Sequence, residues 1–314
     1  MLDENDTGIM EVWITGLENL EETRVYLFTF VLIIYITILT GNFLVISVVA
    51  TQTHLHSPMY LLLCSLSLSE IIFTTNFIPV LLQVIWRDGA AMYLTGCLAQ
   101  FYVCGSLGAT ECFIFASMSY DRYVAICNPL HYVSVMSLQF CGELVLCSWM
   151  CGFASMLITL ILVCQLDFCG PKVIDHFFCD FAPVIELSCS DTDIVNVEFF
   201  MFSSSVTLFP FVFVIGSYVS IILTILKITS SSGRSKTFST CSSHLTVVST
   251  YYGTLVSVYV LPSQYFSKKA NKILCLIYTM VTPLLNPVIY SIRNREIKKG
   301  IQKLLGKASN RQAL

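Results

Sequence analysis

Apolar residues form seven long runs along this chain, and polar segments separate one run from the next. The runs cover residues 25–50, 58–86, 94–127, 138–165, 197–228, 237–261 and 270–291. Each is close to, or longer than, the roughly 20 residues with which an α-helix crosses the hydrocarbon core of a bilayer. All are much longer than the strands of about 10 residues that build a membrane β-barrel. The pattern therefore predicts an all-α membrane protein, a bundle of seven transmembrane helices.

The runs differ in polarity. The first, residues 25–50, carries no charged side chain, whereas the sixth, residues 237–261, is rich in Ser, Thr and Tyr. The assignment of the sixth run as a span therefore depends most on its neighbours. Apart from the segment 166–196, the connections are short, which makes successive helices antiparallel and favours one bundle without a second domain.

The composition agrees with a membrane location. Hydrophobic residues make up 55% of the 314 residues and charged residues 12%, and the mean hydropathy is +0.75. Soluble domains carry about 25% charged residues, so this chain has too few charges to cover a surface that faces water. The net charge of −3 gives no reason to expect a nucleic-acid partner.

The charges outside the spans set the orientation. Residues 1–24 hold seven acidic residues and Arg24 as their single basic residue, whereas residues 292–314 hold seven basic residues. The positive-inside rule places residues 1–24 outside the cell and residues 292–314 in the cytoplasm, on either side of a seven-helix domain over 25–291. The stretch "RNREIKKGIQKLL" predicts a short amphipathic helix on the inner membrane surface. The sequon "NDT" makes Asn5 a glycosylation candidate on the outer side.

Four of the 14 cysteines belong to the outer side. Cys97 begins the third span, and Cys169, Cys179 and Cys189 lie in the long outer loop. Disulfides are expected in this oxidising environment. Four cysteines allow three pairings, and the spacing does not choose among them.

The outer loop also contains "HFFCD", which brings His176, Cys179 and Asp180 together. Imidazole, thiolate and carboxylate groups form a soft-metal cluster when they converge. A disulfide at Cys179 would leave only two ligands, so the disulfide is the favoured interpretation.

Two carboxylates occur in the middle of spans, Glu70 in the second and Glu111 in the third, and Asn42 and Asn286 lie at similar depth. Ionisable groups inside a bilayer are costly and are functional candidates. If the four residues converge, the two carboxylates share a proton or bind a cation, for which sodium is the candidate. The alternative is that each glutamate separately hydrogen-bonds to a helix backbone.

The third span ends in "MSYDRYVAIC", which contains Asp121, Arg122 and Tyr123. From Cys97 to Arg122 a helix rises about 37 Å, slightly more than the roughly 30 Å of the hydrocarbon core. Arg122 therefore reaches the cytoplasmic face, where it can pair with Asp121 in one state and with another partner in a second state. Anchoring at the membrane interface is the simpler alternative.

Several motifs together carry a resemblance. They are "LHSPMYLLLCSLSLSE" (55–70), "MSYDRYVAICNPLHY" (118–132), "SKTFSTCSSHLTVV" (235–248) and "PLLNPVIYSIRN" (283–294). In these motifs the chain resembles the rhodopsin-like (class A) G-protein-coupled receptors and, within them, the odorant (olfactory) receptors.

The resemblance implies a plasma-membrane receptor, not an enzyme, that binds small volatile odorants from the outer side. It further implies a stimulatory olfactory-type heterotrimeric G protein as partner, with a rise in cAMP, and trafficking chaperones for delivery among membrane lipids to the cell surface. It also implies the disulfides Cys97–Cys179 and Cys169–Cys189. The residues that it implies as activation switches are Asp121, Arg122, Tyr123, Tyr218, His244, Asn286, Pro287 and Tyr290.

The chain departs from many relatives at the sixth span, whose cytoplasmic end carries Arg234 and Lys236 but no carboxylate. An ionic lock from Arg122 to this helix is therefore not expected, and Asp121 with uncharged neighbours must restrain Arg122.

When the chain is aligned with amine receptors of the resembled family on Asp121-Arg122-Tyr123, Cys104 stands where those receptors hold an aspartate. The third span has no carboxylate on the outer side of Glu111. A neutral ligand is therefore expected, in a mostly apolar pocket between the outer halves of the helices. Ordinary helix packing is the alternative for each pocket candidate. The candidates are Cys104, Gly105, Gly108, Ala109, Phe202, Val206, Thr207, Tyr252, Leu255, Tyr259 and Thr279.

Rival functions have less support. A receptor for a non-odorant small molecule would share the same features. A transporter or channel would predict internal repeats and interrupted helices in matching places, which the sequence lacks. For an enzyme, no nucleophile, base and acid converge in the polar cluster.

Overall fold

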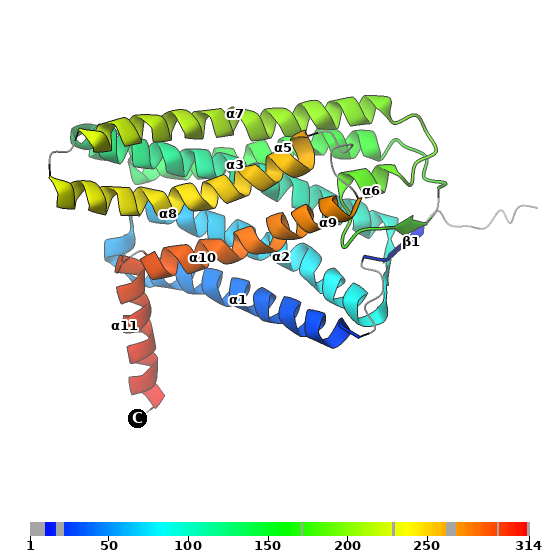
Figure 1. The fold of residues 1–314 in the computed structure, drawn as a ribbon, viewed down its shortest axis with the longest axis horizontal. Helices are drawn as coiled ribbons and strands as arrows, with labels where there is room; N and C mark the ends of the chain where they lie inside the picture. The colour runs from blue at the N-terminus through cyan, green and yellow to red at the C-terminus, as the bar shows by residue number, and fades with distance from the viewer. Residues whose placement is uncertain are drawn as a thin grey trace, which may run out of the picture.

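The computed structural model describes residues 10–16, 22–170, 172–227, 230–261, 268–293 and 295–312. Its long helices lie side by side in one bundle, with a small sheet at one end and a helix that leaves the bundle at the other (Figure 1). The long helices are α1 (Arg24–Thr51), α2 (Pro58–Arg87), α3 (Leu94–Cys127), α5 (Leu138–Val163), α7 (Asp193–Leu226) and α8 (Ser231–Leu255). The shorter helices are α4 (Tyr132–Val135), α6 (Phe181–Ile185), α9 (Lys268–Leu276), α10 (Thr282–Arg293) and α11 (Arg295–Gln312).

Two π-helical segments change the pitch of the last two spans. The segment η3 (Val256–Val260) continues α8, and η5 (Ile277–Val281) joins α9 to α10 in one continuous rod. Two 3₁₀ turns, η1 (Thr53–Leu55) and η2 (Pro129–His131), lie in the inner connections. A π turn rotates the residues that follow it, because it adds one residue to a helical turn.

In the described part of the chain, six helical segments are long and apolar enough to cross a membrane: α1, α2, α3, α5, α7 and the rod over 269–289. Helix α8 is the exception, as its polar composition suggested. It lies between α7 and α10 in the bundle and packs against both (Figure 1). Its place in the bundle therefore depends on its neighbours more than on its own hydropathy.

Helix α3 is at the centre of the bundle. In its apolar window 67% of residues are buried, compared with 28% in α1 and 22% in α5. It packs against α2, α5 and α7. The exposed apolar faces of α1 and α5 are those that a membrane would cover.

Local chemistry explains several helix ends. Pro58 occupies the first turn of α2, where its missing N–H is not needed. Ser137 caps α5 by accepting a hydrogen bond from the Phe140 N–H at 3.1 Å. Helix α7 begins at Asp193, ahead of the predicted residue 197, and the Asp191 side chain accepts a hydrogen bond from its N–H at 2.9 Å.

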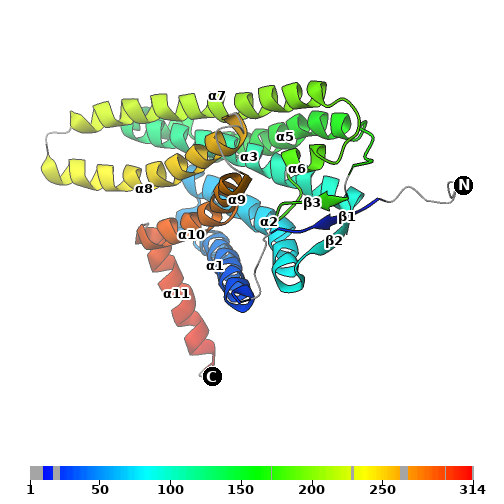
Figure 2. The ribbon, with the colours of Figure 1, turned by 45° about the vertical axis from the view of Figure 1, so that its right-hand side comes forward.

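A three-stranded sheet at the outer end was not predicted. Strand β1 (Glu11–Ile14) lies between β2 (Ala90–Tyr93), to which it is antiparallel, and β3 (Val173–Ile174), to which it is parallel. The segment before α1 is thereby joined to the first and second outer loops, at the end of the bundle opposite α11 (Figure 2). Strands of two to four residues leave no alternating pattern long enough to detect.

Two disulfides hold the outer loop. Cys97 at the start of α3 is bonded to Cys179, and Cys169 is bonded to Cys189. This is the pairing that the family resemblance implied. The first bond fixes the middle of the loop over the end of the central helix.

Candidate functional site

A cavity lies in the outer half of the bundle, between α2, α3, α5, α7, the α8–η3 rod, η5 and the outer loop. It contains about 590 Å³ of space not filled by atoms, part of it continuous with solvent. Its lining is mostly aromatic and aliphatic, with few polar groups. The lining residues are Phe73, Phe101, Cys104, Gly105, Gly108, Ala109, Cys112, Met156, Phe178, Asp180, Phe199, Phe202, Ser203, Val206, Thr207, Leu255, Tyr259 and Tyr278.

Nine of the eleven predicted pocket residues line this cavity. Tyr252 and Thr279 are not among the lining residues. The Tyr252 hydroxyl donates to the Cys112 carbonyl at 2.9 Å, and its ring lies 5.1 Å from that of Phe211. The Thr279 hydroxyl donates to the Cys275 carbonyl at 2.8 Å, and the preceding Tyr278 faces the cavity instead.

Glycines on α3 shape the cavity by admitting neighbouring side chains. A Cβ on Gly105 would lie 2.7 Å from the terminal methyl of Met156, and one on Gly108 would lie 2.7 Å from the Tyr278 hydroxyl. These two glycines therefore allow side chains of α5 and η5 to approach the backbone of α3 closely.

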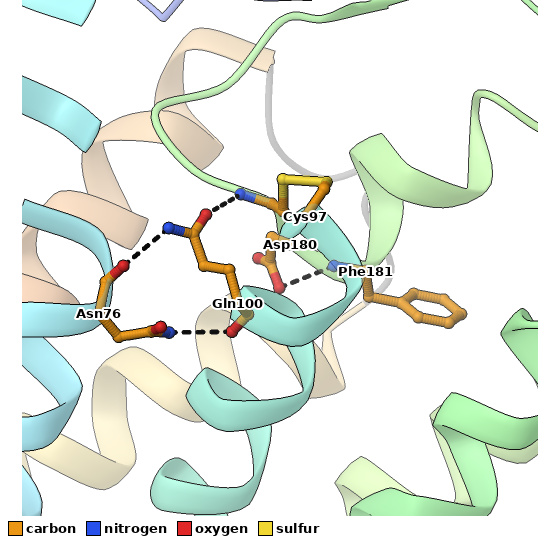
Figure 3. Close-up of a disulfide and its surroundings, with 6 residues drawn as sticks. Asn76, Cys97, Gln100, Asp180 and Phe181 are labelled. Carbon is orange, nitrogen blue, oxygen red and sulfur yellow. Dashed lines mark hydrogen bonds between the residues drawn. A yellow bond between two sulfur atoms is a disulfide. The ribbon is translucent and has the colours of Figure 1, made fainter. Parts of the chain in front are cut away.

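The outer loop contributes two lining residues that the sequence analysis did not assign to the pocket. Phe178 and Asp180 flank Cys179, and the disulfide to Cys97 holds this segment against α3. Gln100 adds a second tie, since its Oε1 accepts from the Cys179 N–H at 2.9 Å and its Nε2 donates to the Asn76 carbonyl at 2.8 Å (Figure 3).

Asp180 is the acidic residue of the cavity lining. Its carboxylate accepts hydrogen bonds from the Phe181 N–H at 2.8 Å and from the Tyr259 hydroxyl at 3.1 Å. Burial raises the pKa of Asp180, and these hydrogen bonds partly oppose the rise. Helix α3 supplies no carboxylate to the cavity, in agreement with its sequence, but the outer loop supplies Asp180.

The predicted polar cluster forms deeper in the bundle. The Asn286 side-chain amide donates to Glu70 Oε1, and the Ser69 hydroxyl donates to Glu111 Oε1 at 3.0 Å. Asn42, Glu70, Glu111 and Asn286 are at most 2% exposed. Among the described residues, Glu70 Oε2, Asn42 Oδ1 and Asn286 Oδ1 have no hydrogen-bond donor. Such buried oxygens suit a hard cation or a shared proton.

At the inner end, Arg122 pairs with the adjacent Asp121, with Nε 2.9 Å from Oδ2. The Tyr132 hydroxyl donates to the other oxygen of Asp121 at 2.8 Å. Burial and the negative Asp121 raise the pKa of Tyr132, so its hydroxyl remains a donor. The carboxylate is fully buried, and each of its two oxygens accepts a hydrogen bond.

A second inner contact joins α7 to α8. The Tyr218 hydroxyl is hydrogen-bonded to Nδ1 of His244, and the two rings are stacked with centroids 5.7 Å apart. Pro287 lies against Gly41, where an added Cβ would come within 2.8 Å of the proline ring. The Tyr290 side chain and all of Asn5 lie outside the described residues.

The inner loop that follows α3 exposes apolar side chains. Leu130 is 94% exposed and Val133 is 84% exposed. They lie on the side that the charge distribution assigns to the cytoplasm, beside the Asp121–Arg122 pair. Exposed apolar residues in such a place suit a protein partner.

A helical membrane bundle with an outer cavity and a charged pair at its inner end has the architecture of a seven-transmembrane receptor. The chain matches the family model "Olfactory receptor" over residues 30–308. It is similar to Olfactory receptor 11L1 of Homo sapiens, with 44% identity over 97% of this chain and 95% of the relative. Olfactory receptor 2AP1 of Homo sapiens is 41% identical over 98% and 99% of the two chains. Olfactory receptor 1E5 of Pan troglodytes is 41% identical over 99% of each.

The chain therefore belongs to the olfactory receptor family. It is a multi-pass G-protein-coupled receptor of the plasma membrane and not an enzyme. Odorant binding and G-protein signalling are the activities of this family, and they follow from membership.

Proposed function

We propose that this receptor binds small, mainly apolar odorants in the outer cavity, with Asp180 and Tyr259 as the polar contact. The proposed ligand is neutral and carries a hydrogen-bonding group, since the Asp180 carboxylate already accepts hydrogen bonds from the Phe181 N–H and the Tyr259 hydroxyl. The apolar lining supports this assignment, and so does the hydrogen bond between Asp180 and Tyr259 within the cavity wall. A small odorant with one or two polar contacts is expected to activate the receptor at about micromolar concentration.

The observation that carries the proposal is the extent of the sixth span. Leu255 and Tyr259 line the cavity, and Tyr251, farther in, donates to the Gly108 carbonyl of α3 at 2.6 Å. His244, still farther in, contacts Tyr218. One helical rod thus contacts the ligand site and the inner switch, so a ligand that shifts it changes the inner end.

Activation is then a shift between two bundle arrangements, driven by the difference in ligand affinity between them. In the resting arrangement Asp121 holds Arg122. In the active one Arg122 is released to the stimulatory olfactory-type G protein, with Leu130 and Val133 as apolar contacts, and cAMP rises. Trafficking chaperones assist the chain to the cell surface.

The test is a cAMP assay with an odorant panel on cells that express the receptor, with surface abundance measured in parallel. Tyr259→Phe is expected to lower agonist potency roughly tenfold, because it removes a hydrogen bond to a carboxyl group. Tyr26→Phe is the matched control, since Tyr26 is 78% exposed on α1, away from the cavity. Unchanged potency in Tyr259→Phe for every agonist would remove this residue from the site.

We also propose that the polar cluster of Asn42, Glu70, Glu111 and Asn286 holds one positive charge, a sodium ion or a shared proton. The two sources are distinguished by replacing sodium with a large organic cation in the cAMP assay at constant pH. A change in basal signal that Glu70→Gln abolishes supports sodium. A basal signal that responds to pH but not to sodium supports the proton.

A further inference from the structure

Three potential metal ligands converge at the outer wall of the cavity. They are His176 and Asp180 from the outer loop and Cys275 from α9, and their ligand atoms all lie within 4.8 Å of one another. Cys179, the cysteine nearest to these two residues in the sequence, is held in the disulfide with Cys97 and is not a metal ligand. The structure places a different thiol at that point, from a residue 95 positions after Asp180.

The contacts within this cluster suit a bound ion. Cys275 Sγ lies 3.9 Å from Asp180 Oδ2, close to the separation of about 3.5 Å that two ligands have on one zinc ion with bonds of roughly 2.0–2.3 Å. The His176 ligand atom lies within 4.8 Å of each of the other two. His176 belongs to the same outer loop as Asp180, four residues before it.

His176 provides an independent indication. It is 6% exposed, and its Nδ1 has no hydrogen-bond partner among the described residues. Buried polar atoms without a partner are rare and costly. An imidazole nitrogen is the commonest metal ligand among side chains.

We propose that His176, Asp180 and Cys275 bind one zinc ion at the edge of the odorant cavity. A mixed nitrogen, oxygen and sulfur set is typical of zinc, and three protein ligands leave a fourth position open. Zinc binding displaces the proton of the Cys275 thiol, which is released to the solvent. Of the three ligands Asp180 lines the cavity, and we place the open position on that side.

This proposal deepens the proposed function and rests on it for one consequence only: the ion coordinates odorants that have a lone-pair donor atom. Apolar odorants without such an atom do not need it. Zinc in the medium therefore raises the potency of the first group and leaves the second unchanged.

The experiment uses the full-length receptor, purified in nanodiscs and stripped with a chelator, and titrates it with Zn²⁺ and then with Co²⁺ as a spectroscopic probe. The native receptor is expected to bind one zinc ion and to show a thiolate-to-cobalt charge-transfer band. Cys275→Ser and His176→Ala lower zinc affinity at least tenfold, and Cys275→Ser removes the band. The matched controls are Cys112→Ser, a thiol of the same cavity, and His56→Ala, at the inner side.

A second measurement needs no variant. Zinc is expected to protect Cys275 of the native receptor from alkylation, read by mass spectrometry, while Cys112 serves as the internal reference. Equal alkylation of Cys275 with and without zinc overturns the proposal, as does zinc binding that Cys275→Ser leaves unchanged.

The cAMP assay separates this proposal from the proposed function. A receptor that responds to odorants but binds no zinc retains its proposed function and loses the metal site. A receptor that binds zinc through Cys275 but responds to no odorant retains the metal site and loses the proposed function.

Discussion

The two ends of the receptor are assembled in different ways. At the inner end the principal contacts are local, since Arg122 pairs with the adjacent Asp121 and Tyr132 lies 11 residues farther on. At the outer end Asp180 contacts Tyr259 and Cys275, which lie 79 and 95 residues away. Local contacts can be inferred from a motif, whereas distant contacts depend on how a loop folds over the bundle.

The largest effect is expected from the disulfide that positions this loop. Cys97→Ser removes a bond that closes 82 residues, and loss of a native disulfide costs about 2–5 kcal/mol. We expect loss of surface expression and of every odorant response. The double variant Cys169→Ser with Cys189→Ser, which opens a separation of 20 residues, should have a smaller effect in the same surface-labelling assay. Equal losses of surface expression in the two variants would show that holding the loop over α3 is not the reason why the Cys97–Cys179 bond is needed.

The inner end gives the next largest effect. Arg122→Ala should abolish the agonist-induced rise in cAMP at normal surface abundance. Asp121→Asn should raise basal cAMP, because it removes the charge that restrains Arg122. Arg234→Ala is the control, as its side chain is exposed at the end of α8. Agonist signalling that survives in Arg122→Ala would disprove the assigned switch.

A steric change in the cavity should have an intermediate effect. Gly108→Ala places a methyl group 2.7 Å from the Tyr278 hydroxyl, so the ring must move into the ligand space. We expect agonist potency to fall about tenfold, a change of roughly 1.4 kcal/mol. Gly142→Ala on α5 is the matched control, because no atom lies within 4 Å of its added Cβ. A shift of equal size in both variants would exclude a cavity effect.

The smallest effect is expected at the outer surface. Lys272 pairs with Asp175 and donates to the Gly16 carbonyl at 3.1 Å, which joins α9 to the outer loop and to the segment before α1. A partly exposed ion pair contributes about 1 kcal/mol or less. Lys272→Ala should therefore shift the thermal midpoint of the purified receptor by a few degrees at most. A decrease of the thermal midpoint by much more than this would show that the contacts of Lys272 are a main source of stability at the outer end.

Agreement between sequence and structure follows the same division between local and distant contacts. The positions of the spans were predictable because apolar length is a local property, and the inner charged pair was predictable because its members are adjacent. The contact between Glu70 and Asn286 was inferred only from their similar depth in the membrane. Residues at the same depth on different helices of a bundle can meet. The outer sheet was missed because its strands are too short to show a period.

The cavity wall shows what can be inferred from the sequence pattern and what depends on helix packing. Periodicity identifies a helical face, but packing decides how far that face is rotated toward the cavity, and the π turn Ile277–Val281 favours Tyr278 over Thr279. Tyr252 is a comparable case, because it is not a lining residue and its hydroxyl donates to the Cys112 carbonyl of α3.

By itself, the sequence determined the membrane class, the orientation, the inner charged pair and most of the cavity wall, because hydropathy, charge and helical depth are properties of single segments. Only the tertiary structure placed Asp180 in the cavity and brought Cys275 to His176. These placements follow from a disulfide-held loop that packs against the ends of distant helices, and no local pattern encodes such contacts.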